Sequence, residues 1–209
     1  MAGFGVGFGV LLSGVLLGGA GGRMPAPASV VARAGIQTAD TGRIRYTRAD
    51  VGFMQGMIAH HGQALTMAAM VPTRSRTAPL RMLAERITVS QKDEIGLIRH
   101  WLLDRKETAP TPDGGHQHHD PGDPMMPGML TVAELGTLEQ ATGPPFERLF
   151  LQFMIRHHEG ALTMVAQLFA SPGAGQDSDI FRFATDVDAD QRAEIRRMRA
   201  LLATINSKP

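Results

Sequence analysis

Cysteine is absent from this chain of 209 residues. The sequence can therefore form no disulfide bond, offers no thiolate ligand to a metal, and lacks the acylated cysteine of a lipoprotein. Aromatic residues make up only 5% of the chain, and the formal net charge is +1. A chain so close to neutrality has no strong field for nucleic acid, and its arginines are scattered over predicted helix faces. Nucleic-acid binding is therefore not predicted.

Runs of β-branched residues are also few, which argues against a sheet. Alanine, leucine, methionine, glutamate, glutamine and arginine dominate the body of the chain, and all of these favour helix. Hydrophobic residues make up 43% of the sequence, enough to bury a core. The composition therefore predicts an all-α fold.

The N-terminal segment differs from the rest of the chain. Residues 4–20 are uncharged, apolar and rich in glycine, and they end in small residues. The length suits the core of a signal peptide or a short membrane anchor, although no basic residue precedes it. We expect residues 1–22 to direct export, with possible membrane contact, and residues 23–46 to form a flexible linker rich in glycine, proline and alanine. This places the protein in the cell envelope or outside the cell.

One stretch of the sequence occurs twice, at residues 50–67 and 147–164. Aligned without a gap, the copies are identical at ten of eighteen positions. The identical pairs are Phe53/Phe150, Gln55/Gln152, Met57/Met154, Ile58/Ile155, His60/His157, His61/His158, Ala64/Ala161, Leu65/Leu162, Thr66/Thr163 and Met67/Met164. An internal repeat of this kind indicates an architecture built from two related halves.

Apolar residues spaced by threes and fours predict two helices in each half. We expect them at residues 47–70, 79–106, 145–169 and 178–205, with a short helix at residues 131–142 before the second hairpin. Short turns make each half an antiparallel hairpin. The two hairpins, 47–107 and 130–205, would form one four-helix bundle over residues 47–205, with pseudo-twofold symmetry.

A linker at residues 108–129 separates the hairpins. Its proline and glycine content excludes a regular element, and its histidines and methionines suggest an auxiliary metal site. The candidate ligands here are His116, His118, His119, Met125, Met126 and Met129.

The repeated stretch places its histidines and methionines on one broad helical face, because each residue advances about 100° around a helix. The predicted metal ligands are Met57, His60, His61, Met67, Met154, His157, His158 and Met164. Imidazole and thioether without thiolate suit copper, Cu(I) above all, with Cu(II) possible and silver bound by the same chemistry. Zinc and calcium do not explain the repeated methionines.

Plainer interpretations apply to parts of this pattern. A methionine on an apolar helical face is usually core filler, and a lone histidine there is usually a satisfied core residue. A His-His pair that recurs in the same register with the same methionine neighbours favours ligation. Six polar residues on or beside the stripes either ligate the metal or orient the histidines of a facing helix. These residues are Asp50, Gln91, Glu94, Glu147, Gln191 and Glu194.

The pattern D-x-x-F-x-x-x-M-I-x-H-H-x-x-A-L-x-M, followed by Q-x-x-E-I, resembles the domain-of-unknown-function 305 family of bacterial envelope proteins. Both halves match it, and the resemblance covers residues 47–205. It implies a ferritin-like helical bundle, usually exported, with copper binding and copper tolerance among members. The motif positions are the eight histidines and methionines named above. The acidic residue that opens each copy differs, being Asp50 in the first and Glu147 in the second.

These observations favour an envelope copper-binding protein that buffers or delivers the ion and is not an enzyme. One alternative is a structural or interaction bundle whose His-Met face is only core. A di-iron or di-manganese oxidase is less favoured, because those sites use Glu-x-x-His motifs and no glutamate here is followed three residues later by histidine. The sequence leaves open the oligomeric state and whether the repeats form one site or two.

Overall fold

A computed structural model describes residues 46–112 and 125–207 of the chain. The described residues form five helices and no strand, so the all-α prediction is confirmed. The helices are α1 (Arg48–Arg74), α2 (Ala78–Asp104), α3 (Val132–Gln140), α4 (Gly143–Ala170) and α5 (Ser178–Asn206). They belong to a compact unit that spans Gly42–Pro209. The expected signal or anchor segment, and the linker up to residue 45, lie outside the described residues.

Side-chain caps determine where α1 begins. The backbone N–H of Asp50 donates to Thr47 Oγ1 at 3.2 Å, and the N–H of Thr47 donates to Asp50 Oδ2 at 2.6 Å. This reciprocal pair is a capping box, which satisfies two backbone donors that the helix cannot. Thr131 and Glu134 form the same arrangement at the start of α3.

Two helix ends that lie near prolines differ from the sequence prediction. Helix α1 continues through Pro72 to Arg74, beyond the expected end at residue 70. Pro72 lies in the last turn, so the hydrogen bond that its missing N–H removes is one of the last in the helix and no further turn follows it. Helix α4 starts at Gly143, two residues before its expected start, because Pro144 and Pro145 fit the first turn, where no N–H is needed.

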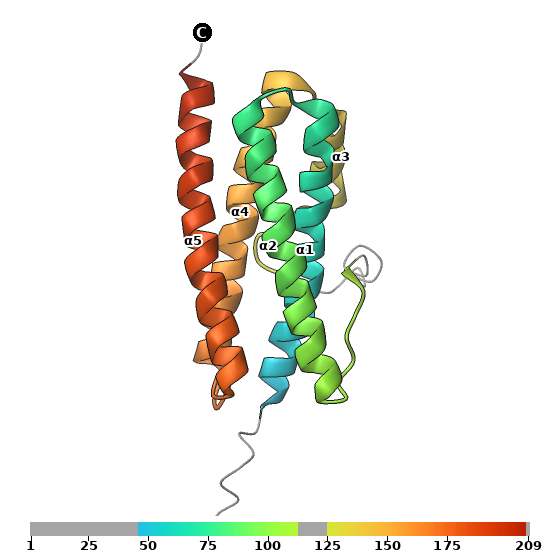
Figure 1. Ribbon diagram of the computed structural model, residues 1–209, viewed down its shortest axis with the longest axis vertical. Helices are drawn as coiled ribbons and strands as arrows, with labels where there is room; N and C mark the ends of the chain where they lie inside the picture. Colours follow the sequence, from blue (N-terminus) through green and yellow to red (C-terminus); the bar gives the residue numbers. More distant parts are fainter. Residues whose placement is uncertain (1–45, 113–124, 208–209) are drawn as a thin grey trace, which may run out of the picture. The chain divides into compact units, whose positions relative to one another are not determined.

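The four long helices pack as two antiparallel hairpins, α1 with α2 and α4 with α5 (Figure 1). Between the hairpins, α1 and α4 pack closely, whereas α2 and α5 make only sparse contact. Each repeated stretch therefore lies on a helix at the interface between the hairpins. None of the helices in residues 46–112 and 125–207 combines the length and apolar character needed to cross a bilayer.

The buried apolar side chains form two separate clusters along the bundle. The first core cluster includes Met57, Met164 and Trp101, and the second core cluster includes Met67, Met154 and Phe150. On each long helix, the residues between the two clusters include buried polar side chains. The hydrophobic core is therefore interrupted midway by a polar layer.

Candidate functional site

Eight side chains at repeat-related positions, two from each long helix, form the centre of the polar layer, and each residue is at most 9% exposed. They are His60, His61, Gln91, Glu94, His157, His158, Gln191 and Glu194. Burying so many polar groups is costly unless they are paired or serve a ligand. The contacts among them therefore decide what the layer can do.

His60 and His157 face each other across the α1–α4 interface. Their ring centroids are 3.8 Å apart and their planes are inclined by 36°. Each ring also lies near its sequence neighbour, with centroids 6.4 Å apart for His60 and His61, and 6.2 Å for His157 and His158. The fold thus brings all four histidines of the repeated motif into one buried cluster.

His61 and His158 instead face the second helix of their own hairpin. His158 Nε2 lies 2.7 Å from Glu194 Oε2 in a buried hydrogen bond. His61 Nε2 lies 2.5 Å from Glu94 Oε2, in an orientation that is poor for a hydrogen bond. Adjacent histidines therefore have different partners, because their side chains leave the helix about 100° apart.

The contacts at Nε2 leave a nitrogen lone pair free on several rings. The carbonyl of Pro127 lies 3.0 Å from His60 Nε2 and can only accept, so that nitrogen carries the hydrogen. In the neutral ring, His60 Nδ1 then holds an unshared pair. The same argument applies to His158, whose Nε2 donates to a carboxylate. The buried ring nitrogens without a hydrogen-bond partner include His60 Nδ1, His61 Nδ1, His157 Nε2 and His158 Nδ1.

Burial keeps the central pair neutral. Loss of hydration, and then the neighbouring His61, lower the pKa of His60 to about 3, against the opposite effect of the Pro127 carbonyl. Burial, and then His60 and His158, hold the pKa of His157 well below its usual value. A neutral imidazole is the form that binds a metal ion.

The four methionines of the repeat flank this cluster on both sides. Met57 and Met164 lie in the first core cluster, and Met67 and Met154 in the second. Each cluster therefore contains one motif thioether from α1 and one from α4. All four are buried, at 0% exposure except for Met164 at 8%.

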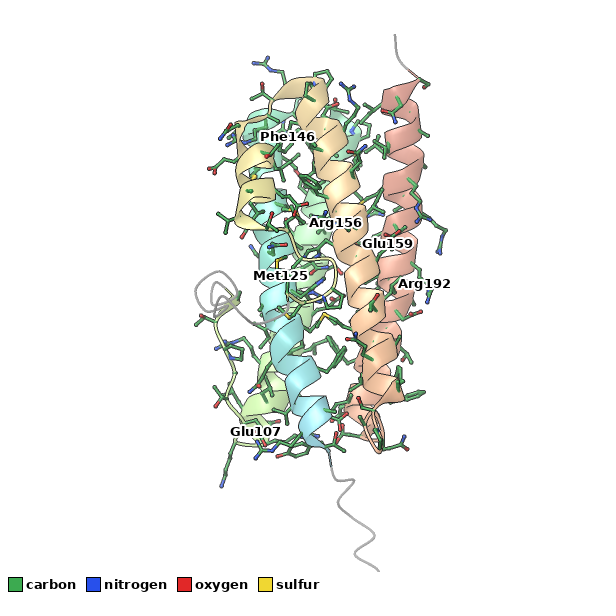
Figure 2. All side chains as sticks on the ribbon, turned by 180° about the vertical axis from the view of Figure 1, so that it is seen from behind. Glu107, Met125, Phe146, Arg156, Glu159 and Arg192 are labelled. Carbon is green, nitrogen blue, oxygen red and sulfur yellow. The ribbon has the colours of Figure 1, made fainter. Side chains whose placement is uncertain are left out.

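Residues 125–130, which run from the end of the linker into the start of the second hairpin, lie against α1 and α4, and we call them the strap segment (Figure 2). Gln63 holds it on α1 by accepting from the N–H of Leu130 at 2.7 Å and donating to its carbonyl at 3.0 Å. On α4, Pro127 and Gly128 pack against Gly160 so closely that a Cβ there would overlap the Pro127 carbonyl.

The sequence motifs do not identify Gln63 or Gly160 as site residues. The signal available was a glycine inside a helical pattern, which is unfavourable unless another backbone packs against it.

The predicted linker ligands have mixed positions. Met126 is partly buried and packs on the first core cluster, with its Sδ and Met164 Cε both beside Gly56. Met129 is 6% exposed, whereas Met125 is 42% exposed. His116, His118 and His119 lie outside the described residues.

Asp50 and Glu147 contact the turns of the bundle. Asp50 Oδ1 accepts the N–H of Gly175, in the α4–α5 turn, at 2.7 Å. Glu147 Oε1 accepts the hydroxyls of Ser75 and Thr77, in the α1–α2 turn, at 2.6 Å each. Each carboxylate thus links its own hairpin to the turn of the other.

Within residues 46–112 and 125–207, no three His, Asp or Glu side chains converge in a geometry that could hold a metal ion. An ion bound in the polar layer would need thioether or backbone donors beside imidazole. The donors present fit that requirement, since buried unpartnered ring nitrogens lie between core clusters that each contain two motif methionines. Such a mixed nitrogen and sulfur set favours a soft ion.

Comparison with known proteins shows the same fold in solved structures. A DUF305 protein from Streptomyces coelicolor is 31% identical, with a TM-score of 0.65, over 77% of this chain and 95% of that one. CopM in its Cu(II)-bound form is 26% identical, with a TM-score of 0.60, over 74% of this chain and 96% of that one. Its Cu(I)-bound form is 25% identical, with a TM-score of 0.57, over 77% and 98% of the two chains.

A shorter similarity links the chain to an uncharacterized protein of Acanthamoeba polyphaga mimivirus, with 35% identity over 57 residues. This match covers 27% of the present chain and 38% of the viral protein. The model of the family described as domain of unknown function (DUF305) matches residues 50–202, which contain both copies of the motif and all four long helices except their outermost residues. The chain therefore belongs to the DUF305 family.

Proposed function

We propose that this protein binds copper as cargo in the polar layer of its helical bundle and buffers or delivers the ion without catalysing a reaction. The ligands would come from the eight motif histidines and methionines, with Cu(I) preferred because thioether donors favour the softer ion. The strap segment and the linker histidines would add auxiliary donors.

One observation carries this proposal. Four histidines from two sequence copies converge in a buried cluster, and each has a ring nitrogen without a hydrogen-bond partner. An unsatisfied buried polar atom is expensive, and four in one layer are hard to explain by core packing. A soft cation that accepts those lone pairs would offset this cost.

Similarity to CopM supports copper as the ion. That protein has been crystallised with Cu(I) and with Cu(II), and its fold matches most of this chain. The Streptomyces relative is presumed to be secreted, which agrees with the export predicted from residues 1–22. On this basis we propose that the protein is exported to the cell envelope or out of the cell.

A structural role for the polar layer is the alternative. The pairs between His61 and Glu94 and between His158 and Glu194 are what a purely structural network would contain. In that case the histidines would orient the hairpins, and the fold would be indifferent to copper.

The test is a Cu(I) competition titration of the full chain against a chromogenic chelator. Three proteins are compared: the parent, a variant with His60, His61, His157 and His158 changed to Gln, and a variant with His116, His118 and His119 changed to Gln. The linker variant controls for loss of imidazoles elsewhere. Circular dichroism of each protein verifies that the helices are intact.

We expect the parent and the linker variant to bind tightly and the bundle variant to lose most of its affinity. If the linker variant loses binding and the bundle variant keeps it, the site is in the linker and the proposed location is wrong. If the parent does not compete with the chelator, the protein is not a copper carrier and the structural alternative gains support.

A further inference from the structure

A cleft of about 730 Å³ opens between α2 and α5, where the two hairpins make sparse contact. Residues on both helices line it, among them Leu97, Trp101, Phe183 and Val187. The proposed copper site does not use this cleft directly. The charge of the cleft, and one of the residues that line it, nevertheless connect the cleft to that site.

The charged side chains around the cleft leave an excess of negative charge. Arg105 lies near Asp177 and Asp179, and Arg182 also pairs with Asp179. Asp186 and Asp190 line the cleft as well and form no ion pair within residues 46–112 and 125–207. Two unpaired carboxylates on one wall attract cations from solution.

The pKa of Asp190 reflects the same concentration of charge. Burial, and then the carboxylates of Glu94 and Glu194, raise it above its ordinary value, while Arg197 acts in the opposite direction. These carboxylates therefore repel one another, and a cation in the cleft would relieve that repulsion.

The floor of the cleft includes Glu94, which is only 9% exposed. Its Oε2 receives no hydrogen bond and lies 2.5 Å from His61 Nε2, while Ser90 donates to its Oε1 at 3.2 Å. Among the residues that line the cleft, Glu94 contacts a motif histidine directly. A buried carboxylate in contact with His61 thus joins the cleft to the polar layer.

The second hairpin lacks this connection. Glu194, the counterpart of Glu94, is 3% exposed and does not line the cleft. The acidic wall is also specific to α5, because the repeat places Arg86 and Ser90 on α2 where α5 carries Asp186 and Asp190. The helical repeat therefore does not require these acids for folding, and the two hairpins are not equivalent toward the cleft.

We propose that the α2–α5 cleft is the access route by which a soft monovalent cation reaches the polar layer, with Asp186 and Asp190 attracting the ion and Glu94 passing it to His61. This inference rests on the proposed copper-binding function. On this route, the acidic side chains of the cleft determine how fast the ion enters the protein, and they are not its final ligands. Loading is accordingly asymmetric and begins at the histidine of the first hairpin.

Stopped-flow loading of the full chain with Ag(I) tests this route. Trp101 is the only tryptophan and lines the cleft, so its fluorescence reports arrival of the ion. The test variant carries Asp186→Asn and Asp190→Asn. The control carries Asp188→Asn, which lies between them on α5 but pairs with Arg192 at 2.7 Å.

We expect the double variant to load roughly 3- to 10-fold more slowly than the parent at low ionic strength, with the difference shrinking in high salt. Its equilibrium affinity for Ag(I), measured by competition, should stay within about twofold of the parent. The control should match the parent in both measurements.

Equal loading rates in the parent and the double variant would overturn the access route while leaving the copper-binding proposal intact, since the ion would still bind. An unchanged loading rate with a weaker affinity would make the two aspartates ligands, which also contradicts the route. Failure of the parent to bind Ag(I) at all would overturn the proposed function, and this inference with it.

Discussion

At the scale of single residues, the two histidines of each pair have different contacts although they are adjacent in sequence. His60 and His157 pack on each other and are kept neutral by burial, whereas His61 and His158 face buried glutamates. Burial has therefore removed water from His60 and His157. Their rings contact each other, and each ring keeps a nitrogen without a hydrogen-bond partner. This makes the protonation state and the neighbours of this pair the most informative points to test.

The low pKa of the central pair predicts that the metal-free protein loses stability in mild acid. An unfolded histidine titrates near pH 6.5, whereas folded His60 titrates at about 3. Above pH 6.5 the histidine is neutral in both states, and the full stability of the fold is present. As the pH falls toward the folded pKa, only the unfolded state binds the proton. The free energy of unfolding therefore falls by about 1.4 kcal/mol per pH unit for each such histidine. Urea unfolding between pH 7.5 and 4.5 measures the slope.

A variant with His60→Gln and His157→Gln should show a flatter dependence over the same range, because these groups no longer bind protons on unfolding. Exposed His100 supplies the control, and His100→Gln should leave the slope unchanged. Identical slopes in the parent and the double variant would show that other groups cause the acid sensitivity.

The motif methionines can be separated from ordinary core methionines by substitution with leucine. Met57→Leu and Met164→Leu nearly conserve volume and should cost less than about 1.5 kcal/mol of unfolding free energy. If the thioethers are ligands, each change should weaken Cu(I) binding by at least about tenfold. Chelator competition measures the affinity.

Met54 is the matched control. It is 2% exposed, packs in the same core cluster, and aligns with Leu151 in the second copy of the repeat. Met54→Leu should leave Cu(I) affinity unchanged. An equal loss in all three variants, or in none, would assign the motif methionines to core packing.

At the scale of elements, the strap segment is held between α1 and α4. Its backbone packs closely on α4, and a glutamine side chain of α1 hydrogen-bonds to it. Gly160 receives Pro127 and Gly128, and Gln63 binds both backbone groups of Leu130. These contacts also bring the Pro127 carbonyl to His60. The tautomer of a buried histidine is thus fixed by a loop.

Gly160→Ala should displace the strap segment, because the added Cβ overlaps the Pro127 carbonyl. We expect a loss of about 1–3 kcal/mol in stability, as for other overpacked sites, and faster hydrogen exchange of the Leu130 amide. Gly96→Ala on α2 is the control, since nothing lies within 4 Å of its added Cβ. That change should stabilise the helix by up to about 1 kcal/mol. Unchanged exchange at Leu130 in Gly160→Ala would contradict the packing argument.

At the scale of the whole helical unit, the hairpins are joined by reciprocal contacts at their ends. Asp50 on α1 binds the α4–α5 turn through Gly175, and Glu147 on α4 binds the α1–α2 turn through Ser75 and Thr77. Repeat symmetry places the two acids at equivalent positions at opposite ends of the paired helices α1 and α4. These contacts thereby fix the position of one hairpin on the other. That position in turn brings His60 against His157.

Asp50→Asn should weaken this link at one end only. The change leaves one oxygen where two accepted hydrogen bonds, so we expect a loss of about 1–3 kcal/mol and faster exchange of the Gly175 amide. Glu147→Gln should destabilise by a similar or smaller amount without affecting that amide. Amide exchange followed by NMR separates the two ends, and faster exchange at Gly175 in both variants would indicate general loosening instead of a local link.

How much of the site the sequence predicted depends on the range of the interaction. Helical periodicity is a local property, so the sequence alone predicted four long helices, their hairpin pairing and the shared face of His60, His61 and Met57. The composition of that face predicted a soft-metal donor set. The placement of Glu94 against His61 follows the expectation that polar residues on the second helices face the histidines, whereas their role toward a metal stays a prediction.

Only the tertiary structure decided which groups meet. A one-residue step turns a side chain by about 100°, so the sequence could not show that His60 reaches across to α4 while His61 turns to α2. It also could not show that Asp50 and Glu147 bind turns, because a carboxylate's partners depend on which loop packs beside it. The cleft between α2 and α5 likewise depends on how two complete hairpins pack, because α1 and α4 make closer contact than α2 and α5. The repeated sequence therefore determined the donors, and the packing of one repeat on the other determined their partners and their exposure to solvent.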